Sequence, residues 1–275
     1  MERIATGYAL AEAPVAAEDG GLYFSDVLGG GVHRWSPASG EVEAVVPKRR
    51  GIGGMAIDRS GALIVSGRDV SRVDGNESSV LYGDEDATGF NDLTVDPDGR
   101  IVVGVLRFRP FAGEQPVPGE FVGLDHGSAT EVLAGVEWPN GCAFAPGGTT
   151  FYGCDYERGV VLAAEREPDG RYGDAHVAIE CPGGDADGMA VDENGGVWVA
   201  LGGRGTVGRF TPDGELDSEV EVPAGFVSSV CFGGADGRDL FVTTAGDPGD
   251  PDAPGGVYMA RAPVRGAPIP AARLD

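Results

Sequence analysis

The chain of 275 residues contains 44 Asp and Glu residues against 20 Lys and Arg residues, which gives a formal net charge of −24. This charge excludes nucleic acid and anionic membrane surfaces as partners. Hydrophobic residues make up 41% of the chain, enough for a sizeable core. No apolar run approaches the roughly 20 residues of a membrane-spanning helix, and no secretion signal opens the sequence. We therefore expect a soluble, cytoplasmic, globular protein.

A short motif recurs along the whole chain. In each copy a turn of acidic or polar residues ends in Gly, and a β-branched or aromatic run follows. The marker glycines are Gly20, Gly61, Gly99, Gly148, Gly195 and Gly237, at intervals of 41, 38, 49, 47 and 42 residues. Intervals of this size are typical of the blades of a propeller.

Each unit also contains an apolar strand before its marker and two further strands after it. The strands predicted before the second to sixth markers are residues 55–57, 93–95, 142–144, 189–191 and 230–232. Six units of four antiparallel strands without an amphipathic helix predict an all-β fold, a six-bladed β-propeller, as a single domain over residues 1–275. The last unit has little chain left for a fourth strand, so we expect residues 3–8 to close the last blade. A two-sheet sandwich is the alternative.

Polar residues occupy equivalent places in most units. The position eight residues before each marker is Glu12, Gly53, Asn91, Asn140, Asp187 and Ser229. Because equivalent blade positions surround the axis of a propeller, four units would direct carboxylate or amide oxygens at one point. Oxygen ligands favour a divalent cation, Ca²⁺ first, with Mg²⁺, Mn²⁺ or Zn²⁺ as alternatives, although Zn²⁺ normally recruits His or Cys. The competing interpretation is that Asn140-Gly141 and Asp187-Gly188 are ordinary turn formers.

The motifs around these positions resemble those of the regucalcin/gluconolactonase family, which includes luciferin-regenerating-enzyme-like proteins. The resemblance runs from about Leu10 to Gly266 and rests on the segments Ala11-Glu12-Ala13-Pro14, Phe90-Asn91-Asp92, Pro139-Asn140-Gly141 and Ala186-Asp187-Gly188. It implies that Glu12, Asn140 and Asp187 are metal ligands and that Asn91 contacts the metal, its bound water or the substrate. It also implies metal-dependent hydrolysis of sugar lactones.

We therefore expect an enzyme that opens the ring of a lactone, an aldonolactone first. The metal ion would polarise the carbonyl, Asp187 would accept a proton from the attacking water, and Asn91 would orient carbonyl or water. The alternatives are an organophosphate or ester hydrolase of the same fold and a non-catalytic, metal-stabilised binding propeller. The partner would be a small-molecule substrate, and the protein a monomer or a small homo-oligomer.

The substrate region departs from the family pattern. Family members commonly carry Arg where this chain has Gly89, and an acidic residue in the following lid loop, where this chain has Arg107 and Arg109. These arginines are either solvated loop residues or reach over the mouth of the channel to bind substrate oxygens. Trp138, next to Pro139-Asn140, is expected to line the pocket, and residues 106–120 are expected to form a mobile lid.

The four cysteines show no CxxC pair and are expected to be reduced structural thiols. A Cys142–Cys154 bridge is left open, because the two residues could face each other on adjacent strands.

Overall fold

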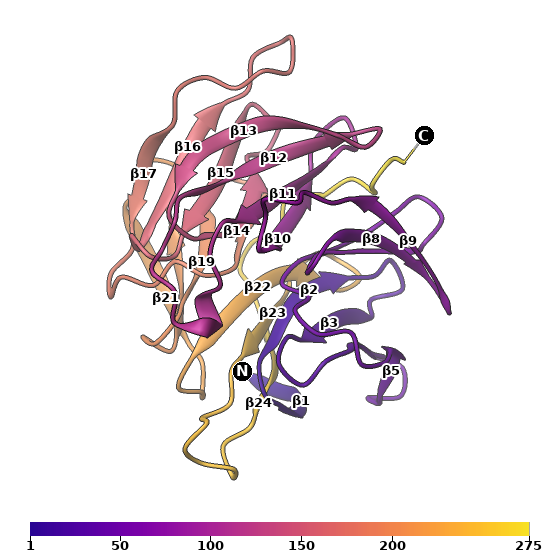
Figure 1. Cartoon of the computed structure of the whole chain (residues 1–275). Helices are drawn as coiled ribbons and strands as arrows, with labels where there is room; N and C mark the ends of the chain where they lie inside the picture. The colour runs from indigo at the N-terminus through magenta and orange to yellow at the C-terminus, as the bar shows by residue number, and fades with distance from the viewer. Residues whose placement is uncertain (275) are drawn as a thin grey trace.

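The computed structural model describes residues 1–274, which form six four-stranded antiparallel sheets (Figure 1). The innermost strand of each sheet contacts the innermost strands of both neighbouring sheets, which closes the ring. The predicted six-bladed β-propeller is therefore confirmed. From the innermost strand outwards, the blades are β2 (Ala11–Ala16), β3 (Leu22–Asp26), β4 (Val32–Trp35) and β5 (Val42–Val46); β6 (Met55–Ile57), β7 (Leu63–Val65), β8 (Val70–Asp74) and β9 (Glu77–Tyr82); β10 (Gly89–Val95), β11 (Ile101–Leu106), β12 (Gly119–Asp125) and β13 (Ser128–Val136); β14 (Pro139–Phe144), β15 (Thr150–Asp155), β16 (Val160–Glu165) and β17 (His176–Glu180); β18 (Met189–Val191), β19 (Val197–Leu201), β20 (Thr206–Phe210) and β21 (Leu216–Glu221); and β22 (Val227–Gly233), β23 (Asp239–Thr244), β24 (Gly255–Arg261) and β1 (Glu2–Tyr8).

The last blade is closed by the first strand of the chain, as predicted. β1 pairs antiparallel with β24, with Thr6 opposite Gly256. In Figure 1 the indigo N-terminal strand accordingly lies beside the last strand of the chain. Both ends of the sequence therefore contribute to one sheet, which fixes the circumference of the ring.

The marker turns explain the repeat. All six marker glycines have positive φ, between 70° and 89°, a conformation that Gly adopts without the steric penalty of a Cβ. In the third copy the Asp96 carboxylate accepts hydrogen bonds from the backbone N–H groups of Asp98 (2.9 Å) and Arg100 (2.8 Å). The Asp58 and Asp192 carboxylates make equivalent bonds in their own turns. Each polar-Gly motif therefore forms the turn that joins the first and second strands of a blade.

The antiparallel strand order gives the ring two different faces. We call the face at which the six innermost strands begin the front face, and the opposite one the back face. The marker turns lie on the back face, whereas the connections between the second and third strands of each blade lie on the front face, among them residues 107–118. Within residues 1–274, helical structure is limited to the 3₁₀ turn η1 (Pro110–Ala112) in that connection, so no helix there is long and apolar enough to cross a membrane.

Apolar side chains fill the spaces between neighbouring blades. Aromatic pairs join the third blade to the fourth (Phe121 and Phe151, ring centroids 5.3 Å apart) and the fifth to the sixth (Trp198 and Phe232, 5.5 Å). Such pairs stabilise a fold by about 0.5–1.5 kcal/mol each beyond the burial of their area. All four cysteines are free, so the Cys142–Cys154 bridge is not formed.

The C-terminal segment, residues 262–274, crosses the back face from one side of the ring to the other. Near its start, Gly266 and Ala267 donate backbone hydrogen bonds to Gly237 (2.9 Å) and Val191 (2.8 Å), in the sixth and fifth blades. Near its end, the N–H groups of Ala272 and Arg273 bond to the carbonyls of Ile57 (2.9 Å) and Gly99 (2.7 Å), in the second and third blades. The segment therefore ties together blades on opposite sides of the axis.

Replacing Ala272 by aspartate is expected to lower the free energy of unfolding by about 3 kcal/mol. The side chain is 1% exposed and packs in the apolar cluster of Val95 and Ile101, so a carboxylate there would lose its hydration. Urea unfolding measures the change. The matched control is Ala271→Asp, because the neighbouring Ala271 is exposed. Equal stability of the two variants would show that the segment is not anchored as described.

Candidate functional site

The front end of the axis is held by hydrogen bonds that run from blade to blade. All six boundaries between neighbouring blades carry one near the start of the innermost strands. In ring order these are Ser25 Oγ to the Ile52 carbonyl (2.7 Å), the Phe90 N–H to the Gly67 carbonyl (2.6 Å), Asn91 Nδ2 to the Pro139 carbonyl (3.0 Å), the Gly141 N–H to the Asp187 carbonyl (3.2 Å), the Gly188 N–H to the Ser228 carbonyl (2.8 Å) and Ser228 Oγ to the Ala11 carbonyl (2.7 Å). These bonds therefore fix the innermost strands against one another near the polar positions predicted from sequence. Those positions, here called the ring residues, are Glu12, Asn91, Asn140 and Asp187.

Glycines allow this close approach. A Cβ on Gly188 would lie 2.0 Å from Ser229 Oγ, and one on Gly141 would lie 2.5 Å from the Met189 nitrogen. Neither glycine has positive φ. The interpretation of Asn140-Gly141 and Asp187-Gly188 as ordinary turn formers is therefore wrong: here Gly is needed because the neighbouring backbone leaves no room for a side chain.

β-Bulges in the innermost strands change the directions in which the ring residues point. The pairing of the first and second strands shifts register between Glu12 and Val15, between Phe90 and Leu93, between Pro139 and Cys142, and between Val227 and Ser229. Ala13, which follows Glu12, has φ 51°, an uncommon value for a residue with a Cβ. Bulges and such backbone outliers concentrate at functional sites, where they redirect side chains.

The structure gathers the predicted ring residues at this end of the axis. Glu12, Asn140 and Asp187 are buried, and Asn91 is half-buried. The Asn140 side chain lies close to the Asp187 carboxyl and lowers its pKa. Glu12 Oε2 accepts a bond of 2.8 Å from the Ala13 N–H. The roles of these four residues remain predictions.

A third carboxylate, Asp92, was missed by the sequence analysis. Its side chain is buried, and Oδ2 has no hydrogen-bond partner in residues 1–274. Burial raises the pKa of Asp92 to about 7. Selecting the residue eight positions before each marker glycine gives one residue per blade, and in the third blade that residue is Asn91. The only signal for Asp92 was the adjacent pair of polar residues in an apolar strand.

The three carboxylates repel one another in a space that is poor in water. Burial raises the pKa of Glu12, and repulsion from Asp187 and then Asp92 adds to the effect. Burial likewise raises the pKa of Asp187, with further contributions from Asp92 and Asp185 and a partial offset from the neighbouring Asn140 side chain. None of the three forms a salt bridge within the described chain. A bound cation would remove this electrostatic cost.

The donor set fits a hard divalent cation only if amides take part. Among residues 1–274, no three His, Cys, Asp or Glu side chains are arranged to hold a metal ion by themselves. Carboxylate oxygens of Glu12 and Asp187 would need the amide oxygen of Asn140, and that of Asn91, to complete the ligand set. All of these are oxygen donors, as Ca²⁺ and Mg²⁺ prefer.

An aromatic wall stands beside this site, formed by Phe108, Trp138 and Tyr156. The Trp138 ring lies edge to face with Phe108 (centroids 5.6 Å apart) and 4.6 Å from the Tyr156 ring. Burial raises the pKa of Tyr156, and Asp187 is the next contributor, so the phenol lies near the carboxylates. Trp138 was singled out from sequence, whereas Phe108 and Tyr156 were not, because they reach the site from β11–β12 and β15–β16 connections.

Arg107 and Arg109, in the connection between β11 and β12 that was predicted to be a lid, bind carboxylates of the chain itself. Arg107 Nη1 lies 2.8 Å from Asp84 Oδ2, and its Nη2 binds the Glu120 carboxylate. Arg109 Nη1 lies 2.9 Å from Glu114 Oε1. Their predicted contacts with substrate stay predictions, and each guanidinium charge is already compensated in this structure.

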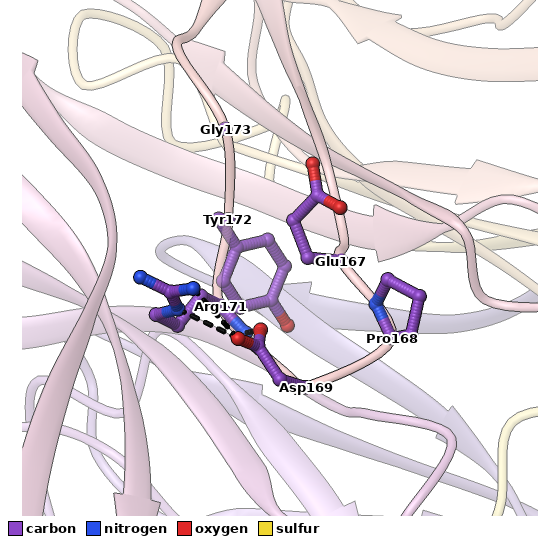
Figure 2. Close-up of a pocket in the computed structure, with 6 residues that line it drawn as sticks. All are labelled: Glu167, Pro168, Asp169, Arg171, Tyr172 and Gly173. Atoms are coloured by element: carbon purple, nitrogen blue, oxygen red, sulfur yellow. Dashed lines mark hydrogen bonds and ion pairs between the residues drawn. The ribbon is translucent and has the colours of Figure 1, made fainter.

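A separate pocket lies on the back face, in the connection between β16 and β17 (Figure 2). Its lining contains an ion pair, in which Arg171 Nη2 and Asp169 Oδ2 are 2.7 Å apart. The lining residues are Glu167, Pro168, Asp169, Arg171, Tyr172 and Gly173. Because this turn joins the outer two strands of the fourth blade at their back end, the pocket is not part of the site at the axis.

Comparison with known proteins gives the family of this fold and site. The pentonolactonase XacC of Haloferax volcanii is 34% identical over 253 residues, covering 89% of this chain and 84% of that protein. The 6-deoxy-6-sulfogluconolactonase of Pseudomonas putida is 31% identical and covers 86% and 83%. The structure of regucalcin from Agrobacterium tumefaciens superposes with a TM-score of 0.88 at 24% identity, over 99% of this chain and 97% of that one. The model of the SMP-30/Gluconolactonase/LRE-like region matches residues 10–246, and the chain therefore belongs to that family.

Proposed function

We propose that the protein is a metal-dependent hydrolase that opens the ring of a lactone, most simply a sugar lactone. The observation that carries the proposal is the buried convergence of Glu12, Asp92 and Asp187 with two amides at the front end of the axis. The names of the relatives, pentonolactonase and sulfogluconolactonase, support lactones as the substrate class.

Glu12, Asn140, Asp187 and Asn91 would hold the ion. When bound, it supplies Lewis-acid polarisation of the lactone carbonyl. Calcium is the first candidate, since the donors are all oxygens and the Agrobacterium relative is described as a calcium-binding protein.

The chain's own residues supply proton transfer and orientation. Asp187 is a carboxylate within a buried site, able to accept a proton from the attacking water. Asn91 is anchored through its Nδ2, which donates to the Pro139 carbonyl, so its Oδ1 is held in a fixed direction. A Cβ at Gly53 would lie 2.2 Å from that oxygen. Because Gly53 has no side chain, the neighbouring blade leaves room for the Asn91 amide oxygen.

The proposal is tested by proton release from a panel of aldonolactones and simple γ- and δ-lactones. Metal-free protein is assayed alone and after separate additions of Ca²⁺, Mg²⁺, Mn²⁺ and Zn²⁺. We expect turnover only with added metal. Tight metal binding without lactone turnover would instead favour a binding propeller, and turnover confined to simple esters or organophosphates would favour the other hydrolase class.

Chelation is also expected to lower the melting temperature, independently of activity. Without a cation the three buried carboxylates repel one another, and a ligand that binds only the folded state stabilises it by mass action, by about 2.7 kcal/mol at a hundred times its dissociation constant. Differential scanning fluorimetry of EDTA-treated protein during a calcium titration measures this. An unchanged melting temperature over the whole titration would argue against an ion at the axis.

We further propose that residues 1–275 act as one domain, in a monomer or small homo-oligomer in the cytoplasm. Sedimentation at several protein concentrations tests the oligomeric state.

A further inference from the structure

We propose that Trp138 and Tyr156 form the surface against which the lactone ring lies, and that the Tyr156 hydroxyl donates a hydrogen bond to a hydroxyl group of the substrate. The inference rests on the proposed lactonase function and adds the specificity-determining residues and the class of lactone.

The two side chains are attached rigidly to the site. Trp138 directly precedes Pro139, whose carbonyl accepts the Asn91 hydrogen bond, and Asn140 follows. The backbone N–H of Trp138 donates to the buried carboxylate of Asp155 (3.3 Å). The N–H of Tyr156 in turn donates to the Trp138 carbonyl (3.0 Å). The indole and the phenol therefore stand side by side at the front ends of β14 and β15, and their ring positions are set by the same backbone that places Asn140.

The Tyr156 hydroxyl is a free donor. No hydrogen bond from it forms within residues 1–274, although the residue is half-buried. A phenol carries its proton at neutral pH and can donate a hydrogen bond to an oxygen. The substrate would supply an oxygen in this place.

The wall also indicates which lactones fit. Aromatic rings pack well against the C–H face of an uncharged sugar ring. The geometry therefore points to lactones whose ring carries hydroxyl groups and presents an apolar C–H face to the aromatic pair.

The test compares two substrates in Tyr156→Phe. One is a pentono-1,4-lactone, and the other is γ-butyrolactone, the same ring without hydroxyl groups. We expect kcat/KM for the hydroxylated lactone to fall about five- to tenfold, mainly through KM, because one hydrogen bond is lost. The value for γ-butyrolactone should stay unchanged. Trp138→Leu should lower kcat/KM for both rings, and Trp138→Phe should restore most of it.

The matched control is Tyr172→Phe, which removes a hydroxyl that also lacks a hydrogen-bond partner but lies in the back-face pocket of Figure 2. Its kinetics should equal those of wild type. A wild type that hydrolyses no lactone contradicts the proposed function itself. A wild type that hydrolyses lactones, with Tyr156→Phe unchanged on the hydroxylated one, overturns this inference alone. Equal losses on both substrates, with a lowered melting temperature, would also overturn it, because they would show a structural role only.

Discussion

Replacing Asp187 by asparagine is expected to abolish lactone hydrolysis while the propeller stays folded. The substitution keeps the size of the side chain, but it removes the negative charge and the proton acceptor. General-base groups contribute about 10²–10⁴-fold, and the loss of a ligand charge adds to this, so we expect kcat/KM to fall at least a thousandfold. Proton-release kinetics at saturating calcium measure the change, and isothermal titration should show weaker calcium binding.

A folding defect can be separated from this effect. Asp187 is one of three buried carboxylates, and its charge raises the pKa of Glu12, so the metal-free Asp187→Asn variant should melt at a higher temperature than metal-free wild type. Asp213→Asn, an exposed position in a back-face turn of the same blade, is the matched control and should keep full activity. Turnover near that of wild type in Asp187→Asn would rule out the proposed role of this carboxylate.

The fold was predictable because its signal is local and repeated. A turn that needs positive φ selects Gly in every copy, as at Gly99 and Gly195, and the flanking strands alternate with the period of a sheet. Even the closure of the ring followed from the count of strands at the C-terminal end. The course of the last residues across the back face was not predictable, because backbone hydrogen bonds such as that from Ala272 to Ile57 leave no pattern in the side chains.

The site was predictable only as far as one equivalent position per blade. That rule found Glu12, Asn140 and Asp187, which the structure gathers, but it missed Asp92, because the bulge between Phe90 and Leu93 breaks the alternation of the strand. Tyr156 was missed for a different reason. Its contact with Trp138 joins a connection within the fourth blade to the connection between the third and fourth blades, and no spacing in the sequence encodes it.

The partners of the lid arginines show the same limit. Arg107 meets Asp84 and Glu120 from two separate segments, so the sequence alone could not decide between a solvated and a substrate-binding guanidinium. Long-range ion pairs depend on side-chain placement in three dimensions, whereas turn glycines depend only on the local backbone.

Stability of the metal-free protein is expected to fall as the pH rises from about 4 to about 7, and Asp92→Asn should remove the share of this dependence that Asp92 contributes beside Glu12 and Asp187. The ordinary pKa of an aspartate is 3.8, and burial raises that of Asp92 to about 7. Between these values the folded protein retains a proton that the unfolded chain has released, so folding loses stability as the pH rises through the window. Integrated over it, the penalty is roughly 4 kcal/mol, and it is fully present above pH 7.

Urea unfolding of EDTA-treated protein at pH 4.5, 6 and 8 measures this dependence. Asp92→Asn should be more stable than wild type at pH 8, by an amount that shrinks towards pH 4.5. The net charge of −24 also destabilises the protein as its carboxylates ionise, so the control must change charge equally. Glu85→Gln does so at an exposed front-face position. If Asp92→Asn and Glu85→Gln gave the same pH dependence, global charge rather than the orphaned oxygen at the axis would account for the loss of stability.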